Sequence, residues 1–389
     1  MCSALRRVPA STGPTSLLAR PAPRSPGRSG REREVWADVA KGACIPLVVL
    51  WHVVTKHYLR IDWHAWPVPG AWGALTEQLV PLRMPLFFTV SGMFATGAVN
   101  RPWRGLLRSK TARWLYLYAV WLLIHTALLA PAPGFGTARA RDLGELLGQL
   151  TVTPSNLWYL YALALYFPIA KATRRLPGSL VTAAALALSA ATAAGVLETP
   201  GDRGGVYANL FFFLAGARFR PLIERLVATA TTRRLLLTAA AYGTALAATA
   251  VAGARTWPGV WPAVCVLATV FGLTAAARVA RVEQVEQVAG VARRPWPARA
   301  LARLGRTTLP VYVLHMPLLA LLDLALTGPL SAVARLSTPP AVRVLVAAGE
   351  PVVVTALLVG LCLALHRVLL RAGARWLFDL PRRSHPSSR

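Results

Sequence analysis

Apolar segments recur along the chain at about the length that a helix needs to cross a bilayer. A transmembrane helix requires about 20 predominantly apolar residues. We count ten such segments, separated by more polar connections. They cover residues 37–55, 78–99, 114–131, 156–170, 179–197, 206–217, 235–253, 259–277, 307–327 and 351–370. This pattern predicts an all-α, polytopic membrane protein with about ten transmembrane helices and no separate soluble domain.

The composition is not that of a soluble protein. Of the 389 residues, 55% are hydrophobic and only 15% are charged, whereas soluble domains are about 25% charged. The formal net charge of +28 would suggest nucleic-acid binding in a soluble chain. Here the basic residues lie in tails and in connections between apolar segments, so we expect a lipid bilayer and no nucleic acid as the partner. The four cysteines show neither disulfide nor metal-site spacing.

The distribution of Lys and Arg predicts the orientation of the chain. The five odd-numbered connections together hold eight of these residues, and the tails and even-numbered connections hold nearly all the others. Connections rich in Lys and Arg face the cytoplasm. We therefore expect a multi-pass protein of the cell membrane with both termini cytoplasmic. Residues 1–35 would form a disordered basic tail, residues 36–370 the membrane domain, and residues 371–389 a second basic tail.

The first apolar segment carries charged and titratable side chains, which are costly inside a bilayer and mark candidate functional sites. Lys41 and His52 are eleven residues apart, so on a helix they lie about 20° apart on one face and about 16 Å apart along the axis. Asp38 precedes Lys41 by three residues and falls near the same stripe. Lys41 alone is equally well explained by snorkelling to the headgroups. His52 lies too deep for that explanation.

The second segment, QLVPLRMPLFFTVSGMFATG, places Arg83 near its outer end. His52 lies near the outer end of the first segment, so the two side chains have similar depth and can share a cavity. Pro81 and Pro85 flank Arg83 and predict a broken helix start that frees backbone groups there. The alternative is an interfacial anchor, which we consider weaker because apolar sequence follows Arg83 directly. Ser91 in the same segment is a further binding candidate.

The remaining polar groups in the apolar segments are less specific. His315 lies within the ninth segment and either orients His52, lines a binding site or makes an interhelical hydrogen bond. Trp158 and Tyr159 read as part of an interfacial aromatic belt, with stacking against an acceptor as the alternative. We expect an interhelical hydrogen bond for Asp323. Two further side chains lie at segment ends, and we expect an interfacial His125 and a solvated Glu350.

Four motifs together resemble the integral-membrane acyltransferase family three, whose members are O-acetylase-like, and the first is similar to its fucose O-acetylase-like branch. The motifs are DVAKG…VVLWH with Lys41 and His52, RMPLFFTVSGMF with Arg83, NLWYLYAL, and LGRTTLPVYVLHMPL with His315. The likeness covers nearly all of residues 36–370. Many relatives have arginine where this chain has Lys41, and lysine keeps the charge but loses the bidentate fork.

The resemblance implies transfer of an acyl group, acetyl by default, from cytoplasmic acyl-CoA to an acceptor hydroxyl, with no bound cofactor. The acceptor would be a sugar, a glycan or a glycosylated small molecule. A hydroxyl needs a base placed at its proton, and histidine suits that role near neutral pH. His52 is therefore the expected base, with a covalent acyl-His52 relay also open. Lys41 would hold donor phosphate or pantetheine groups, and Arg83 would stabilise either the oxyanion or the donor.

Two other functions remain open at this stage. A multi-span transporter or flippase of a small polar or lipid-linked substrate would also bury charges near the midplane, but it predicts two repeated halves that the sequence does not show. A membrane scaffold without chemistry would gain nothing from Lys41 and His52 on one helix face. Covalent transfer of an acyl label to a product separates the enzyme from both.

Overall fold

The computed structural model describes residues 27–288 and 297–381, and this part of the chain is helical, with no strand. The α-helices are α1 (Gly27–Lys56), α2 (Val68–Gln78), α3 (Val80–Met93), α4 (Thr96–Val99), α5 (Trp103–Leu106), α6 (Ala112–Leu128), α7 (Leu143–Thr151), α8 (Trp158–Ala172), α9 (Gly178–Ala193), α10 (Arg203–Arg218), α11 (Arg220–Ala228), α12 (Thr232–Val251), α13 (Val260–Val288), α14 (Pro297–Arg306), α15 (Thr308–Val333) and α16 (Pro340–Arg371). Short 3-10 turns are η1 (Tyr58–Arg60), η3 (Pro133–Ala138), η4 (Thr173–Arg175), η5 (Ala254–Thr256) and η6 (Arg375–Leu377), and η2 (Leu107–Thr111) is a π-helical turn. Most of the predicted N-terminal tail (residues 1–26) and residues 382–389 of the C-terminal tail lie outside the described residues.

The all-α prediction is confirmed for the described residues, and each of the ten predicted apolar segments coincides with a helix. Five helical segments are long and apolar enough to cross a membrane, and they run over Val35–Arg60, Thr232–Val251, Val260–Val282, Thr308–Val333 and Pro340–Arg371. The helices at the other five segments are shorter, with 14 to 17 residues each. The count of ten crossings and the cytoplasmic location of both termini therefore stay predictions.

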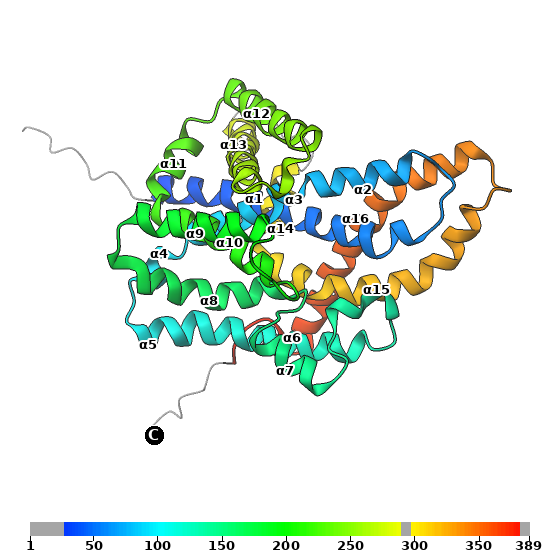
Figure 1. Ribbon diagram of the computed structural model, residues 1–389, viewed down its shortest axis with the longest axis horizontal. Coiled ribbons are helices and arrows are strands. Elements are labelled where there is room, and N and C mark those ends of the chain that lie inside the picture. The colour runs from blue at the N-terminus through cyan, green and yellow to red at the C-terminus, as the bar shows by residue number, and fades with distance from the viewer. Residues whose placement is uncertain (1–26, 289–296, 382–389) are drawn as a thin grey trace, which may run out of the picture.

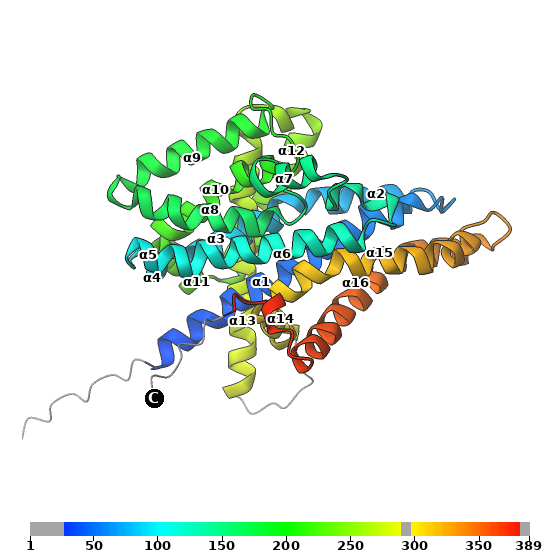
Figure 2. The same cartoon turned by 90° about the horizontal axis from the view of Figure 1, so that it is seen from below.

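The helix α1 occupies the centre of the molecule, where it packs against α3, α13, α14, α15 and α16. In Figure 1, α1, α6, α8, α10 and α15 run along the long axis of the molecule. The helix α13 crosses this direction steeply, as Figure 2 shows. The helix α16 changes direction along its length (Figure 2), and Pro351 inside it supplies a cause, because proline removes one backbone hydrogen bond.

Two glycines let α3 and α10 cross at backbone contact. A Cβ atom added at Gly92 would lie 2.0 Å from the carbonyl oxygen of Phe213, and one added at Gly216 would lie 2.1 Å from that of Thr89. No side chain fits at either position. Small residues at such crossings let helix backbones approach closely, which is the main packing device between helices in membranes.

The helix α14 crosses α1 in the same way. A Cβ atom at Gly42 would lie 1.9 Å from the carbonyl oxygen of Leu301, and one at Gly305 would lie 1.8 Å from that of Asp38. This second glycine pair fixes α14 against the half of α1 that carries Lys41. The α3–α10 and α1–α14 crossings thus help to position the helices that carry Arg83 and Lys41.

Gly92→Ala and Gly216→Ala should each destabilise the fold. The added methyl group meets a backbone carbonyl that cannot rotate away, and overpacking of this kind costs about 1–3 kcal/mol or more. The measurement is the thermal unfolding midpoint of the purified protein in detergent, together with its elution profile. Gly360→Ala in α16 is the matched control, because a Cβ there meets nothing within 4 Å. Equal midpoints for all three variants would contradict close contact at the α3–α10 crossing.

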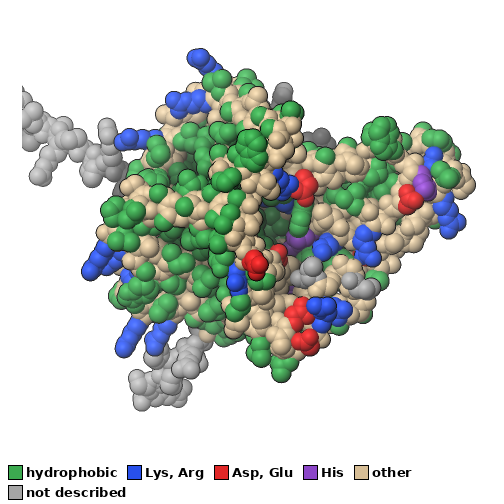
Figure 3. Space-filling view, in the orientation of Figure 1, with side chains coloured by type: hydrophobic (Ala, Val, Ile, Leu, Met, Phe, Trp, Pro, Cys, Tyr) green, Lys and Arg blue, Asp and Glu red, His purple; other side chains and the backbone are tan. Residues whose placement is uncertain are grey.

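Basic side chains gather at one end of the molecule. On the face seen in Figure 3, the left end shows Lys and Arg side chains without acidic ones, whereas acidic and basic side chains mix towards the centre and right. This separation agrees with the alternation of basic and poor connections along the sequence. The left end is the one that the orientation prediction assigns to the cytoplasm.

Single cysteines introduced at exposed positions test the orientation. Leu143→Cys and Leu336→Cys lie at positions that are 69% and 72% exposed in predicted outer connections, and Leu222→Cys lies at a position that is 65% exposed in a predicted inner connection. In a Cys2→Ser background, a membrane-impermeant maleimide should label the first two in intact cells or spheroplasts and the third only after permeabilisation. The other native cysteines are buried and give little background. Labelling of Leu222→Cys from outside would invert the assignment.

Candidate functional site

A cavity of about 420 Å³ lies between α1, α3, α8, α9, α10, α13 and α15, near their predicted outer ends. This volume is within the range of ligand pockets. Figure 3 shows a hollow near the middle of this face, with a histidine surface inside it and charged side chains at its rim. The cavity is lined by three of the predicted site residues, His52, Arg83 and Trp158, so the structure brings them together. We call it the outer cavity.

The guanidinium of Arg83 is buried at the base of the outer cavity and is not an interfacial anchor. The side chain is 6% exposed. Its Nη1 donates to the carbonyl oxygen of Leu47 over 3.4 Å, and its carbon Cζ lies 5.0 Å from the ring centre of Trp51. Contact with an aromatic face stabilises a cation where water is excluded. The Nε atom is buried without a hydrogen-bond partner.

His52 borders the same cavity and lies against two aromatic rings. Its ring centre lies 4.7 Å from that of Trp51 and 5.0 Å from that of His315 on α15. The Nδ1 atom is buried without a partner, while the ring lines the cavity, so Nε2 is the nitrogen that can face a ligand. The imidazole is placed for proton transfer to or from a group bound in the cavity.

Trp158 forms part of the cavity wall because α10 leaves room for its indole. A Cβ atom at Gly205 would lie 3.0 Å from ring carbons of Trp158, so glycine lets the indole lie against the α10 backbone. Trp158 thus lines the outer cavity, and its contact with an acceptor stays a prediction. Its neighbour Tyr159 does not line this cavity.

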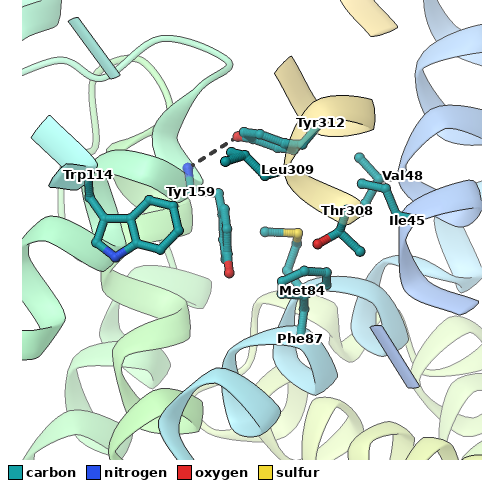
Figure 4. A pocket seen from close by; sticks show the side chains of 9 residues that line it. All are labelled: Ile45, Val48, Met84, Phe87, Trp114, Tyr159, Thr308, Leu309 and Tyr312. Atoms are coloured by element: carbon teal, nitrogen blue, oxygen red, sulfur yellow. Dashed lines mark hydrogen bonds between the residues drawn. The ribbon is translucent and has the colours of Figure 1, made fainter. Parts of the chain in front are cut away.

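A second, apolar cavity adjoins the outer cavity on its inner side. It has a volume of about 60 Å³. Figure 4 shows its lining residues, which are Ile45, Val48, Met84, Phe87, Trp114, Tyr159, Thr308, Leu309 and Tyr312. Val48, Met84 and Tyr312 line both cavities and form the partition between them. We call it the inner cavity. Along α1, the inner cavity lies at the level of Ile45 and the outer cavity at the level of His52.

Tyr159 and Ser91 belong to the inner side. The hydroxyl groups of Ser91 and Tyr159 lie 3.2 Å apart, and the Ser91 hydroxyl donates to the carbonyl oxygen of Phe87 over 2.8 Å. The backbone N–H of Tyr159 donates to the hydroxyl of Tyr312 over 3.3 Å, as the dashed line in Figure 4 shows. Neither Ser91 nor Tyr159 lines the outer cavity with His52.

Lys41 and Asp38 lie together, but away from both cavities. Lys41 Nζ and Asp38 Oδ1 are 3.2 Å apart, and Arg306 Nη1 from α14 lies 3.5 Å from Asp38 Oδ2. Lys41 Nζ also lies 5.8 Å from the ring centre of Phe94. The acid and the cation that were expected near one stripe of α1 form an ion pair, and Arg306 from α14 adds a third charged group. Neither Lys41 nor Asp38 lines the outer or the inner cavity.

Several residues of the outer cavity were not singled out from the sequence. Glu77 and Arg255 form an ion pair at its edge, with Arg255 Nη1 and Glu77 Oε2 3.4 Å apart. Asn156 and Asn209 line it, and the Oδ1 atom of each is buried without a partner. The indole of Trp261 lies under Arg255 at 4.4 Å. In the sequence, these residues could have been found as polar residues that recur at the outer ends of the apolar segments.

A carboxyl group outside the spanning segments lies beside the cavity. Asp202 directly precedes α10, whose first turn borders the cavity through Gly204 and Gly205. Burial raises the pKa of the Asp202 carboxyl to about 6, and the positive charge of Lys56 acts in the opposite direction. Asp202 itself does not line the cavity.

The structure settles three further expectations. Asp323 on α15 makes a hydrogen bond to the turn that directly follows α1, because its Oδ1 lies 2.8 Å from Nδ1 of His57. The expectation of an interfacial His125 is wrong, since the side chain is 0% exposed and its Nε2 donates to the carbonyl oxygen of Val313 over 2.8 Å. The expectation of a solvated Glu350 is also wrong, because Glu350 is 5% exposed and lies 3.1 Å from Nε2 of His57. In both cases a neighbouring helix covers the side chain.

No group of three or more His, Cys, Asp or Glu side chains that could hold a metal ion occurs within residues 27–288 and 297–381. The outer cavity offers instead one imidazole, one buried guanidinium, two amides and several indoles. These groups suit hydrogen bonding and proton transfer with an organic ligand that carries hydroxyl groups.

Comparison with known proteins identifies the family. The chain is similar to the inner membrane protein YcfT of Escherichia coli (strain K12), with 29% identity over 226 residues. That match covers 54% of this chain and 62% of YcfT, so the chain matches less than two thirds of the length of this relative. No solved structure matches the chain. The model of the acyltransferase domain matches residues 34–376, and because this match includes all ten apolar segments, the chain belongs to the integral-membrane acyltransferase family three.

Proposed function

We propose that the protein is an O-acyltransferase that moves an acyl group, acetyl by default, from acyl-CoA to a hydroxyl of a sugar, a glycan or a glycosylated small molecule. The observation that carries the proposal is the meeting of His52 and Arg83 in one cavity of ligand size. A base can take the hydroxyl proton and a buried cation can stabilise the oxyanion, so the two groups beside a common space suit acyl transfer to an alcohol. Family membership supports the reaction class.

In the proposed reaction, the acceptor hydroxyl occupies the outer cavity with its proton towards Nε2 of His52. The hydroxyl oxygen attacks the thioester carbonyl carbon while His52 accepts the hydroxyl proton. The carbon–sulfur bond then breaks, the ester is formed, and the proton passes from His52 to the departing thiolate. The atoms balance without any other reactant.

The position of Arg83 supports the oxyanion role over the donor role. Its guanidinium is buried beside the outer cavity, which His52 also lines. The Lys41 cluster lies towards the other end of α1. A fixed cation beside the reacting carbonyl stabilises charge that develops on the thioester oxygen. The hydrogen bond from Nη1 to Leu47 and the contact with Trp51 hold it in place before reaction.

The inner end of α1 supplies the expected donor site. Lys41 and Arg306 surround one carboxylate, Asp38, so this cluster keeps a net positive charge. Phosphate groups of CoA are strongly anionic and would be held by such cations. The inner cavity lies between this cluster and His52, which gives the thioester end of the donor a direction of approach.

The lining of the outer cavity supports a sugar-like acceptor. Trp158 and Trp261 provide flat apolar surfaces, and the side-chain amides of Asn156 and Asn209 add hydrogen-bonding groups to the lining. A pocket that combines aromatic walls with a few placed polar groups fixes both position and orientation of a ligand. The ion pair of Glu77 and Arg255 at the edge adds charged contacts for a larger acceptor.

His52→Ala should reduce acyl transfer by about 10²–10⁴-fold, the range that a general base contributes. The measurement uses the purified protein in nanodiscs, acetyl-labelled acetyl-CoA and a mixture of mono- and oligosaccharides, with ester products detected by mass spectrometry. His366→Ala is the matched control, because His366 packs against Phe378 and lines neither cavity. Full activity of His52→Ala would refute the mechanism. Passage of a sugar across the membrane without acetylation would support the transporter alternative.

Arg83 and Lys41 should affect different kinetic constants. Arg83→Ala removes a charge that acts in the transition state, so kcat should fall about 10²–10³-fold with little change in the KM for acyl-CoA. Lys41→Ala removes a donor contact, so that KM should rise while kcat changes little. Arg83→Lys keeps the charge but loses the planar group over Trp51, and its kcat should lie between wild type and Arg83→Ala. The reverse assignment of effects would exchange the two proposed roles.

A further inference from the structure

His315 on α15 has a fixed tautomer. Its side chain is 1% exposed, and its Nδ1 lies 2.7 Å from the carbonyl oxygen of Tyr312 and 3.2 Å from that of Val311. A carbonyl oxygen only accepts hydrogen bonds, so Nδ1 of His315 must carry the proton that it donates. In a neutral imidazole the other nitrogen, Nε2, is then an acceptor.

That acceptor has no partner. Nε2 of His315 is buried without a hydrogen bond, and so is Nδ1 of His52 on α1. A buried polar atom left unpaired costs about 1–3 kcal/mol and calls for an explanation. The two imidazole centres lie only 5.0 Å apart, with a tilt of 42° between the rings. Each of the two neighbouring rings thus carries one orphaned nitrogen.

The segment of α15 that carries His315 is braced by its neighbours. His125 of α6 donates through Nε2 to the carbonyl oxygen of Val313 over 2.8 Å. The hydroxyl of Tyr312 donates to the carbonyl oxygen of Asn156 over 2.9 Å. These bonds tie α15 to α6 and to the start of α8 at the level of His315. A rigid support of this kind is what a group that orients a catalytic side chain requires.

From this geometry we infer that His315 is a positioning residue for His52: its Nε2 accepts a hydrogen bond from Nδ1–H of His52 and so leaves Nε2 of His52 unprotonated towards the outer cavity. In the structure the two rings are in contact without this bond. Hydrogen bonds of catalytic groups are often long or misaligned without substrate and tighten when it binds. The inference rests on the proposed role of His52 as base.

An uncharged partner suits this location. In other enzymes a third group, often a carboxylate, holds the base in the correct tautomer. A carboxylate in the middle of an apolar bundle would carry a large desolvation cost. Neutral His315 accepts one hydrogen bond without adding a charge. When Nε2 of His52 takes the hydroxyl proton, Nδ1–H of the resulting imidazolium still has an acceptor in Nε2 of His315.

Two substitutions distinguish a positioning role of His315 from a role in packing alone. In His315→Asn the amide nitrogen is as far from the backbone as Nδ1 of histidine. The bond to the Tyr312 carbonyl can therefore persist, while the acceptor Nε2 is lost. In His315→Gln the longer amide places a polar atom near the position of Nε2. The thermal midpoint of each variant serves as the folding control.

The primary readout is the tautomer of His52 by ¹⁵N nuclear magnetic resonance of the full chain, labelled at its seven histidines, in nanodiscs. His52→Asn assigns the signal. We expect wild type and His315→Gln to show His52 with an unprotonated Nε2, and His315→Asn to show a mixture of tautomers. An Nε2-protonated His52 in wild type, or the same His52 spectrum in wild type and His315→Asn, would overturn the inference. The wild-type spectrum tests it even where His315→Asn does not fold.

The kinetic arm distinguishes this inference from the proposed function. With acetyl-CoA and the sugar mixture, kcat should fall about 10–100-fold in His315→Asn, the usual effect of losing a supporting group. The KM values should stay constant, and His315→Gln should recover activity to within a few-fold of wild type. Absence of transfer in wild type would refute the proposed function and leave the tautomer result standing. Transfer that is equal in wild type and His315→Asn would refute the role of His315 alone.

Discussion

The absence of water in the apolar segments is the constraint on which this structure depends. Polar atoms in such segments must find partners within the protein. Arg83 meets this requirement through the Leu47 carbonyl and the face of Trp51, and His125 through the Val313 carbonyl. These contacts turn polar side chains towards the interior of the bundle. Buried polar atoms that still lack partners lie around the outer cavity and at the His52–His315 contact, and others lie around His57, Arg343 and Glu350. The first group borders a cavity of ligand size, which is why the candidate site is placed there.

The same packing that stabilises the bundle also shapes the site. Gly92 and Gly216 bring α3 and α10 to backbone contact, and these helices carry Arg83 and Asn209 into one cavity. At the other end, α14 reaches α1 through Gly42 and Gly305 and adds a cation beside Asp38. Close approach requires that these positions have no side chain. Substitutions at the crossings are therefore expected to disturb geometry at the site as well as stability.

The sequence predicted what depends on local pattern and missed what depends on contact between distant segments. Apolar length located the helices, and residue spacing placed Asp38 and Lys41 near one stripe of the first helix, because both are properties of one helix. Similar depth also placed His52 and Arg83 together correctly. The burial of Glu350 against His57 could not be predicted, since it requires α16 to cover the end of α1. Likewise, Asn209 reaches the cavity because α10 packs against α3, which lies far from it in the sequence, and against α8 and α9.

The sizes of the two cavities constrain the proposed reaction. The outer cavity, at about 420 Å³, has room for an acceptor, whereas the inner cavity, at about 60 Å³, is apolar and small. The nucleotide of acyl-CoA is charged and has to stay at the basic end, so only the slender thioester part can extend towards His52. Met84 stands in the partition and is flexible enough to make way for it. In the proposed reaction a cavity this small would favour a short acyl group, and the reacting carbonyl would lie where Arg83 and His52 meet.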